Sequence, residues 1–87
     1  MDENAKQKLR KLVADVLGLA ESDVTQSFSY RDTDRWDSLK HMEIITALEQ
    51  NFSVTLTVDE IIAMISIPDI TRILDSKIAG GSDGTKR

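Results

Sequence analysis

The stretch that decides the fold, residues 37–52, reads DSLKHMEIITALEQNF. Its apolar side chains recur at intervals of three and four residues, which places them on one face of an α-helix. The predicted inward stripe consists of Leu39, Met42, Ile45, Leu48 and Phe52, widened by Ile44 and Ala47. A helix with one apolar face must bury that face against other elements, so the sequence predicts further helices around this one.

Ser38 stands at the N-terminus of this predicted helix, and Asp37 directly precedes it. The first N–H groups of a helix lack internal partners and lie at the positive end of the helix dipole, so an anionic group is stabilised there. The residues alone allow two interpretations: Ser38 carries an anionic group such as a phosphate, or Asp37 or Ser38 only caps the helix. In both cases the Asp37 carboxylate can accept hydrogen bonds from exposed N–H groups.

The same spacing predicts three more helices. The first spans residues 5–17 and ends at Gly18, which suits a left-handed position after a helix. A capping box beginning at Thr57 starts a short third helix, and Ser66 is placed to cap the last one. The predicted inward side chains are Leu9, Leu12, Val13, Val16 and Leu17 in the first helix, Ile61, Ile62 and Ile65 in the third, and Ile70, Ile73, Leu74 and Ile78 in the last.

Residues 19–36 follow neither a helical nor an alternating period, and we expect them to form a loop. So long a loop needs anchors in the core, and the candidates are Val24, Phe28 and Trp36. Trp36 allows two interpretations, because an aromatic ring there can close the loop over the core or line the surroundings of Ser38.

The end of the chain, residues 80–87, holds glycine and polar residues without a large apolar side chain. Ordering such a segment costs conformational entropy with little burial in return, so we expect a flexible tail after a domain spanning residues 1–79. Four helices with narrow apolar stripes can bury them only against one another. The predicted fold class is therefore all-α, a small four-helix bundle with a long first loop and a short third helix.

Composition limits the classes of function. The chain has 87 residues, no cysteine, and 15 acidic against 11 basic side chains, giving a formal net charge of −4. This charge opposes binding to nucleic acid or to anionic lipid, and the absence of cysteine excludes disulfides and Cys-ligated metals. No apolar run is long enough for membrane insertion. We expect a cytoplasmic monomer without a metal site.

The tripeptide Asp37-Ser38-Leu39 and the amphipathic run at residues 42–52 resemble the modification site and second helix of the acyl carrier protein family. The resemblance extends over residues 9–78. It implies a 4′-phosphopantetheine arm joined through a phosphodiester to Ser38, with Asp37 and Leu39 beside it. The arm would hold an acyl, hydroxyacyl or aminoacyl intermediate as a thioester. The implied partners are a phosphopantetheinyl transferase, which uses coenzyme A and a divalent metal, and enzymes that load and transfer acyl groups.

Two further sets of residues are candidates for this function. We expect the cargo to be sheltered between the second and third helices, by Met42, Ile45, Ile61, Ile62 and Ile65. The predicted docking face for partner enzymes consists of Lys40, His41, Glu43 and Thr46. In the family the second helix is usually strongly acidic, whereas residues 38–52 here carry one positive and two negative side chains, a net charge of −1. Lys40 therefore selects a dedicated partner or is a neutral surface substitution.

Two alternatives from other classes of function remain. Ser38, His41 and Asp37 supply the residue types of a hydrolase triad, but on an exposed helix face without a nucleophile turn or oxyanion hole. We therefore expect no catalytic residues, and His41 to be a solvated helix residue. The second alternative is a helical protein-interaction module that is never modified, which an intact mass measurement after treatment with coenzyme A and a transferase would distinguish.

Overall fold

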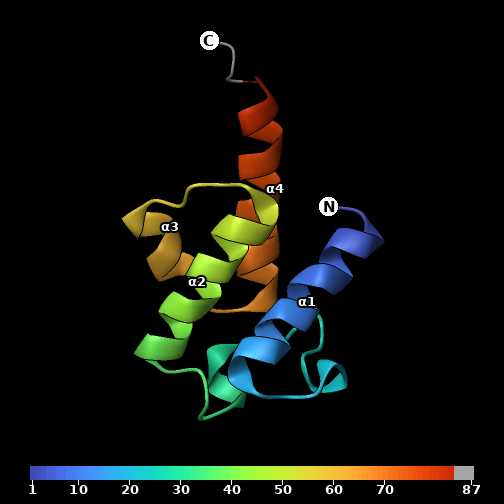
Figure 1. Ribbon diagram of the computed structural model, residues 1–87, viewed down its shortest axis with the longest axis vertical. Helices are drawn as coiled ribbons and strands as arrows, with labels where there is room; N and C mark the ends of the chain where they lie inside the picture. Colours follow the sequence, from blue (N-terminus) through green and yellow to red (C-terminus); the bar gives the residue numbers. More distant parts are fainter. Residues whose placement is uncertain (84–87) are drawn as a thin grey trace.

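The computed structural model describes residues 1–83, and the side chains of residues 1–78. Its α-helices span Glu3–Leu17 (α1), Ser38–Phe52 (α2), Val58–Ala63 (α3) and Ile67–Asp83 (α4), with short 3-10 turns at Glu21–Asp23 and Tyr30–Asp32. In Figure 1, α1 and α2 run side by side in opposite directions, α4 lies behind them, and α3 closes one side. The described residues contain no strand. The prediction of an all-α bundle with a long first loop and a short third helix is confirmed.

Local capping explains most helix boundaries. Helix α1 begins at Glu3, before the predicted start at residue 5, because the Asp2 side chain caps its first turn. It ends at Gly18, whose φ of 71° is the predicted left-handed conformation. Thr57 forms the predicted capping box at the start of α3. The Ser66 hydroxyl accepts a hydrogen bond from a backbone N–H in the first turn of α4.

The core lies between α1, α2 and α4 and is closed by the first loop. Its most deeply buried side chains are Leu9, Val13, Val24, Ile44, Ile45, Leu48, Met64, Ile70 and Leu74. No side chain of α3 is fully buried. At 1.5 Å per residue, the six residues of α3 span about 9 Å, whereas the fifteen of α2 span about 22 Å, so α3 cannot cover the full length of α2.

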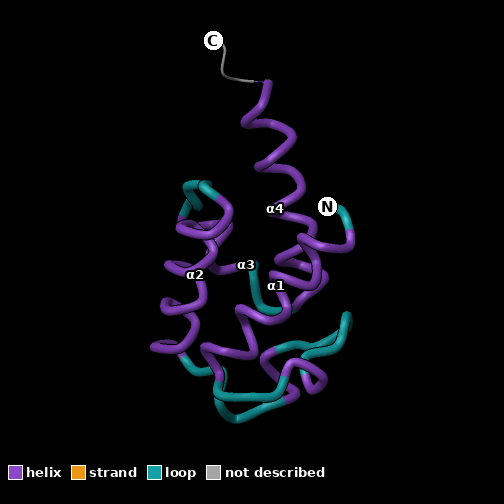
Figure 2. The backbone as a smooth tube through the Cα atoms, turned by 45° about the vertical axis from the view of Figure 1, so that its right-hand side comes forward, coloured by secondary structure: helices purple, strands orange, loops and turns teal. Residues whose placement is uncertain are grey.

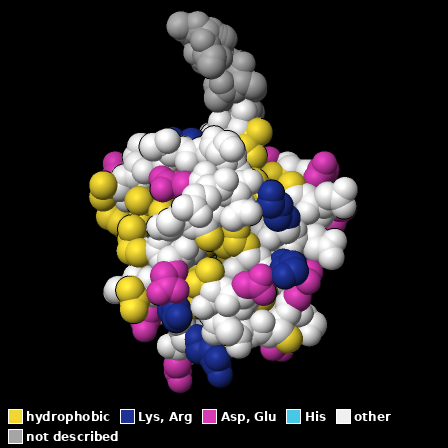
Figure 3. Space-filling model, viewed as in Figure 1, with side chains coloured by type: hydrophobic (Ala, Val, Ile, Leu, Met, Phe, Trp, Pro, Cys, Tyr) yellow, Lys and Arg dark blue, Asp and Glu magenta, His cyan; other side chains and the backbone are white. Residues whose placement is uncertain are grey.

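This difference in length corrects part of the predicted inward stripes. Leu39 and Met42, near the start of α2, are 69% and 48% exposed, and Ile62 in α3 is 66% exposed. The prediction that these side chains face the core was wrong, because no neighbouring helix covers them. Apolar side chains accordingly gather at the surface on the side of the molecule where α3 lies (Figure 3).

The first loop is held in place by its predicted anchors and by the connection between α3 and α4. Val24, Phe28 and Trp36 are all buried, as predicted. The Tyr30 N–H donates to the Ile65 carbonyl at 3.0 Å, and the N–H of the first residue of α4 donates to the Phe28 carbonyl at 2.8 Å. These bonds set the loop beside the residues that follow α3.

Helix α4 continues through residues 80–83, beyond the predicted domain boundary at residue 79. The helix extends over the glycines of this segment at a cost of about 1 kcal/mol each relative to alanine, and the flexibility of the tail stays a prediction. Figure 2 shows α4 reaching past the other helices. Residues 84–87 of the predicted tail lie outside the described residues. Among the described helices, none has the length and apolar character required to cross a membrane.

Candidate functional site

Ser38 is the first residue of α2, and Asp37 is its N-cap. The Asp37 carboxylate accepts from the Lys40 N–H at 2.9 Å, and the Asp37 carbonyl accepts from the His41 N–H at 2.8 Å. The predicted capping role of Asp37 is confirmed. The Ser38 side chain is exposed, and its hydroxyl has no hydrogen-bond partner within the described part of the chain. Capping therefore occupies Asp37 and leaves the Ser38 hydroxyl open to reaction.

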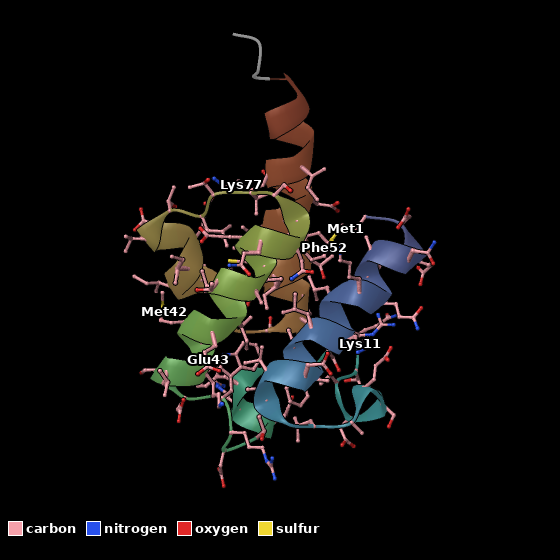
Figure 4. The ribbon with its side chains drawn as sticks, viewed as in Figure 1. Met1, Lys11, Met42, Glu43, Phe52 and Lys77 are labelled. Atoms are coloured by element: carbon pink, nitrogen blue, oxygen red, sulfur yellow. The ribbon has the colours of Figure 1, made fainter. Side chains whose placement is uncertain are left out.

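An open groove with a volume of about 520 Å³ begins at Ser38. Its walls come from the first loop, the start of α2, the end of α3 and Ile65, which follows α3. The lining residues are Tyr30, Trp36, Asp37, Ser38, His41, Met42, Ile62 and Ile65. Figure 4 shows Met42 on the side of α2 that faces α3. The polar end of the groove thus lies at Ser38, and its remaining walls are largely apolar.

Three of the five residues predicted to shelter cargo line this groove, namely Met42, Ile62 and Ile65. The other two do not. Ile45 is only 2% exposed and belongs to the core, and Ile61 is half-buried and packs against the core. Helix phase turns Ile45 toward the core and Ile61 away from the open groove, so their part in sheltering cargo stays a prediction.

Three aromatic or imidazole side chains complete the groove. Trp36 is buried over the core, as one of its two interpretations predicted, and it also lines the groove. Its indole stacks on Phe28 with ring centroids 6.2 Å apart, and on His41 at 6.1 Å. Sequence reasoning missed Tyr30, and the only available signal was an aromatic residue in an otherwise polar loop.

His41 is partly buried and is not the solvated residue that the sequence predicted. The Trp36 indole N–H donates to His41 Nδ1 at 3.0 Å, and His41 Nε2 lies 2.7 Å from the Ile61 carbonyl oxygen. An indole nitrogen can only donate, so Nδ1 carries no proton, and this network assigns the proton to Nε2, which donates to Ile61. With both ring nitrogens engaged, His41 cannot take a proton from Ser38, which argues against the hydrolase alternative.

The other predicted docking residues lie on the open face of α2. Glu43 and Thr46 are exposed, and Lys40 Nζ lies 3.4 Å from the Glu43 carboxylate. Leu39 is the most exposed apolar side chain near Ser38. Because the ring of His41 bonds inward to Trp36 and Ile61, His41 does not share this open face of α2.

Comparisons with known proteins agree with this geometry. The family model described as "Phosphopantetheine attachment site" matches residues 7–74. Polyketide-8 synthase acyl carrier protein 2 of Streptomyces avermitilis is 36% identical over 73 residues, covering 84% of each chain. The chain belongs to the acyl carrier protein family. Acyl carrier protein 1 of the same synthase is 30% identical over 70 residues, covering 80% of this chain and 83% of that protein.

A solved acyl carrier protein has the same fold. The solution structure of the holo acyl carrier protein from Geobacter metallireducens matches with a TM-score of 0.78 and 25% identity, covering 91% of each chain. This family is characterised by covalently attached 4′-phosphopantetheine, so this acyl carrier protein is a carrier that presents its cargo to biosynthetic enzymes. Among its described residues there is no group of three His, Cys, Asp or Glu side chains suited to hold a metal ion.

Proposed function

We propose that Ser38 carries the 4′-phosphopantetheine arm and that the protein holds an acyl intermediate of polyketide or fatty acid biosynthesis. The observation that supports this most directly is the exposed Ser38 hydroxyl, without a hydrogen-bond partner among the described residues, at the first position of α2 and at the end of the groove. The residues present fit the group. The helix N-terminus stabilises the phosphodiester anion, and the groove offers apolar walls beyond it.

The attachment chemistry needs only a hydroxyl from this chain. Ser38 Oγ would attack the phosphorus of coenzyme A that bears the pantetheine, the phosphoanhydride bond would break, and adenosine 3′,5′-bisphosphate would leave. A base on the phosphopantetheinyl transferase would receive the hydroxyl proton. The bound arm supplies a terminal thiol that holds the acyl cargo as a thioester. Asp37 holds the first turn of α2 so that Ser38 stays exposed, and Met42, Ile62 and Ile65 offer the cargo an apolar wall.

We further propose that Leu39, Lys40, Glu43 and Thr46 form the docking face for partner enzymes. Leu39 supplies an exposed apolar contact beside Ser38. Lys40 would meet an acidic side chain of its dedicated partner and repel the basic patches of enzymes that recognise strongly acidic carriers. Its ion pair with Glu43 already offsets part of this charge, so the partner's acid has to compete with Glu43.

Intact mass spectrometry tests the attachment site. The wild-type chain incubated with coenzyme A and a broad-specificity transferase is expected to gain the mass of one phosphopantetheine, and Ser38→Ala is expected to gain none. Ser76→Ala, at an exposed helical serine away from the groove, is the matched control and should be modified fully. The proposal fails if Ser38→Ala still gains the arm or if the wild-type protein never does.

A further inference from the structure

Helix α3 is the helix least firmly held in the bundle. It buries none of its side chains completely, and Val58 and Ile62 are mainly exposed. Glu60 ties its first turn to α4 through an ion pair with Lys77 at 2.9 Å. Toward α2, the only hydrogen bond of α3 in the described part of the chain is the one between His41 and the Ile61 carbonyl. Among the described residues, His41 therefore makes the one hydrogen bond between α2 and α3, in addition to the burial of Met64 after α3.

The Ile61 carbonyl lies in the last turn of α3, where carbonyls have no partner four residues ahead in the helix. Its other hydrogen bond comes from the Met64 N–H, at a longer 3.3 Å. The His41 Nε2–H at 2.7 Å thus satisfies a helix-end carbonyl that would otherwise be poorly paired. A side chain of α2 in this way caps the C-terminus of α3.

Trp36 holds the imidazole ring of His41, which caps the C-terminus of α3. Its indole is only 6% exposed and stacks on the imidazole of His41, and its N–H holds Nδ1 as an acceptor. The proton is thereby kept on Nε2, facing α3. Trp36, His41 and Ile62, the residue after the bonded carbonyl, all line the groove. The two hydrogen bonds therefore link the first loop, α2 and α3 beside it.

We propose that His41 is a positioning residue that sets the width of the groove beside Ser38 and so limits the size of the cargo that the groove accepts. Breaking its bond to Ile61 releases Ile62 outward with the end of α3, while the Tyr30 N–H still holds the Ile65 carbonyl. The effect on cargo rests on the proposed attachment at Ser38, whereas the effect on α3 does not require the arm.

The unmodified protein tests the structural step. In His41→Ala, hydrogen exchange of the α3 amides is expected to be about three- to tenfold faster than in the wild type, the effect of losing one partly buried hydrogen bond. Trp36→Phe keeps a smaller aromatic ring for stacking and loses the N–H, and should show a smaller increase. His41→Gln, with both an acceptor and a donor, should restore part of the protection. Gln50→Ala, exposed on the same helix, is the matched control.

The nitrogen chemical shifts of His41 report which ring nitrogen carries the proton, and a simple loss of packing does not change this. We expect the Nε2–H form in the wild type, and a loss of this preference in Trp36→Phe. The proposal is overturned if the wild-type ring carries its proton on Nδ1, or if α3 exchanges at the wild-type rate in His41→Ala.

Cargo size tests the second step. Holo-proteins loaded with straight acyl chains of increasing length should rise in melting temperature until the groove is filled, because a group bound only by the folded state stabilises it. In His41→Ala this rise should continue to longer chains than in the wild type. The same limiting length in both proteins would overturn the specificity role. Failure of the wild type to load at all would instead refute attachment at Ser38 and leave the exchange results valid.

Discussion

Replacement of Asp37 separates the capping of α2 from the negative charge beside Ser38. Asp37 has an extended backbone, its carboxylate accepts from the Lys40 N–H at 2.9 Å, and it is exposed. Asp37→Ala removes both the hydrogen bond and the negative charge at the helix N-terminus. Asp37→Asn keeps a side-chain oxygen for the cap and removes only the charge. The two variants therefore divide the contribution of this residue into its two physical parts.

The expected magnitudes follow from this geometry. Loss of an N-cap side chain costs about 1 kcal/mol, and loss of an exposed charge at a helix N-terminus costs about 0.3–1 kcal/mol. In a domain of this size, each kcal/mol changes the melting temperature by about 4–8 °C. Asp37→Ala loses both contributions, about 1.3–2 kcal/mol, and is thus expected to melt about 5–16 °C below the wild type. Asp37→Asn loses only the charge, about 0.3–1 kcal/mol, so its melting temperature should fall by about half as much or less.

Thermal unfolding followed by circular dichroism measures these differences, and hydrogen exchange of the Lys40 amide reports on the first turn directly. Asp34→Ala is the matched control, because Asp34 is an exposed loop residue that has no side-chain hydrogen bond or ion pair within the described region. It should melt like the wild type. The reasoning is refuted if Asp37→Ala melts at the wild-type temperature, or if Asp37→Asn is destabilised as much as Asp37→Ala.

Two further predictions concern charged residues. The Glu60 carboxylate accepts from the Thr57 N–H at 2.8 Å and pairs with Lys77, and these contacts hold its pKa below the ordinary value. The stability that Glu60 contributes is therefore present at neutral pH and lost as pH falls through its folded-state pKa. The drop in melting temperature on acidification should thus be smaller in Glu60→Gln than in the wild type. Equal drops in the two proteins would contradict this. Lys40→Glu breaks the ion pair with Glu43. It should slow turnover with the native partner and speed modification by enzymes that prefer acidic carriers, and both differences should shrink as salt is added. Equal rates for the two proteins at low salt would show that Lys40 is an ordinary surface residue.

Local sequence rules were sufficient for the helices and for the place of Ser38. Capping by Asp37, Thr57 and Gly18, and apolar spacing within each helix, depend on residues no more than about one turn apart, so the sequence displays them directly. The anchors of the first loop were also predictable, since large apolar side chains in a polar segment have few other places to go. These rules predicted the bundle and an exposed serine at the start of α2.

Only the tertiary structure decided what surrounds Ser38. Met42 satisfies the same helical period as Leu48, yet it faces an open groove because α3 is too short to cover it. His41 looked like a surface residue because its partners, Trp36 and Ile61, come from a loop and from another helix. Contacts between segments far apart in the chain depend on how whole elements pack together, and no local spacing encodes that packing. The sequence therefore determined the place of Ser38 at the start of α2, and the packing of the loop, α2 and α3 determined the groove beside it.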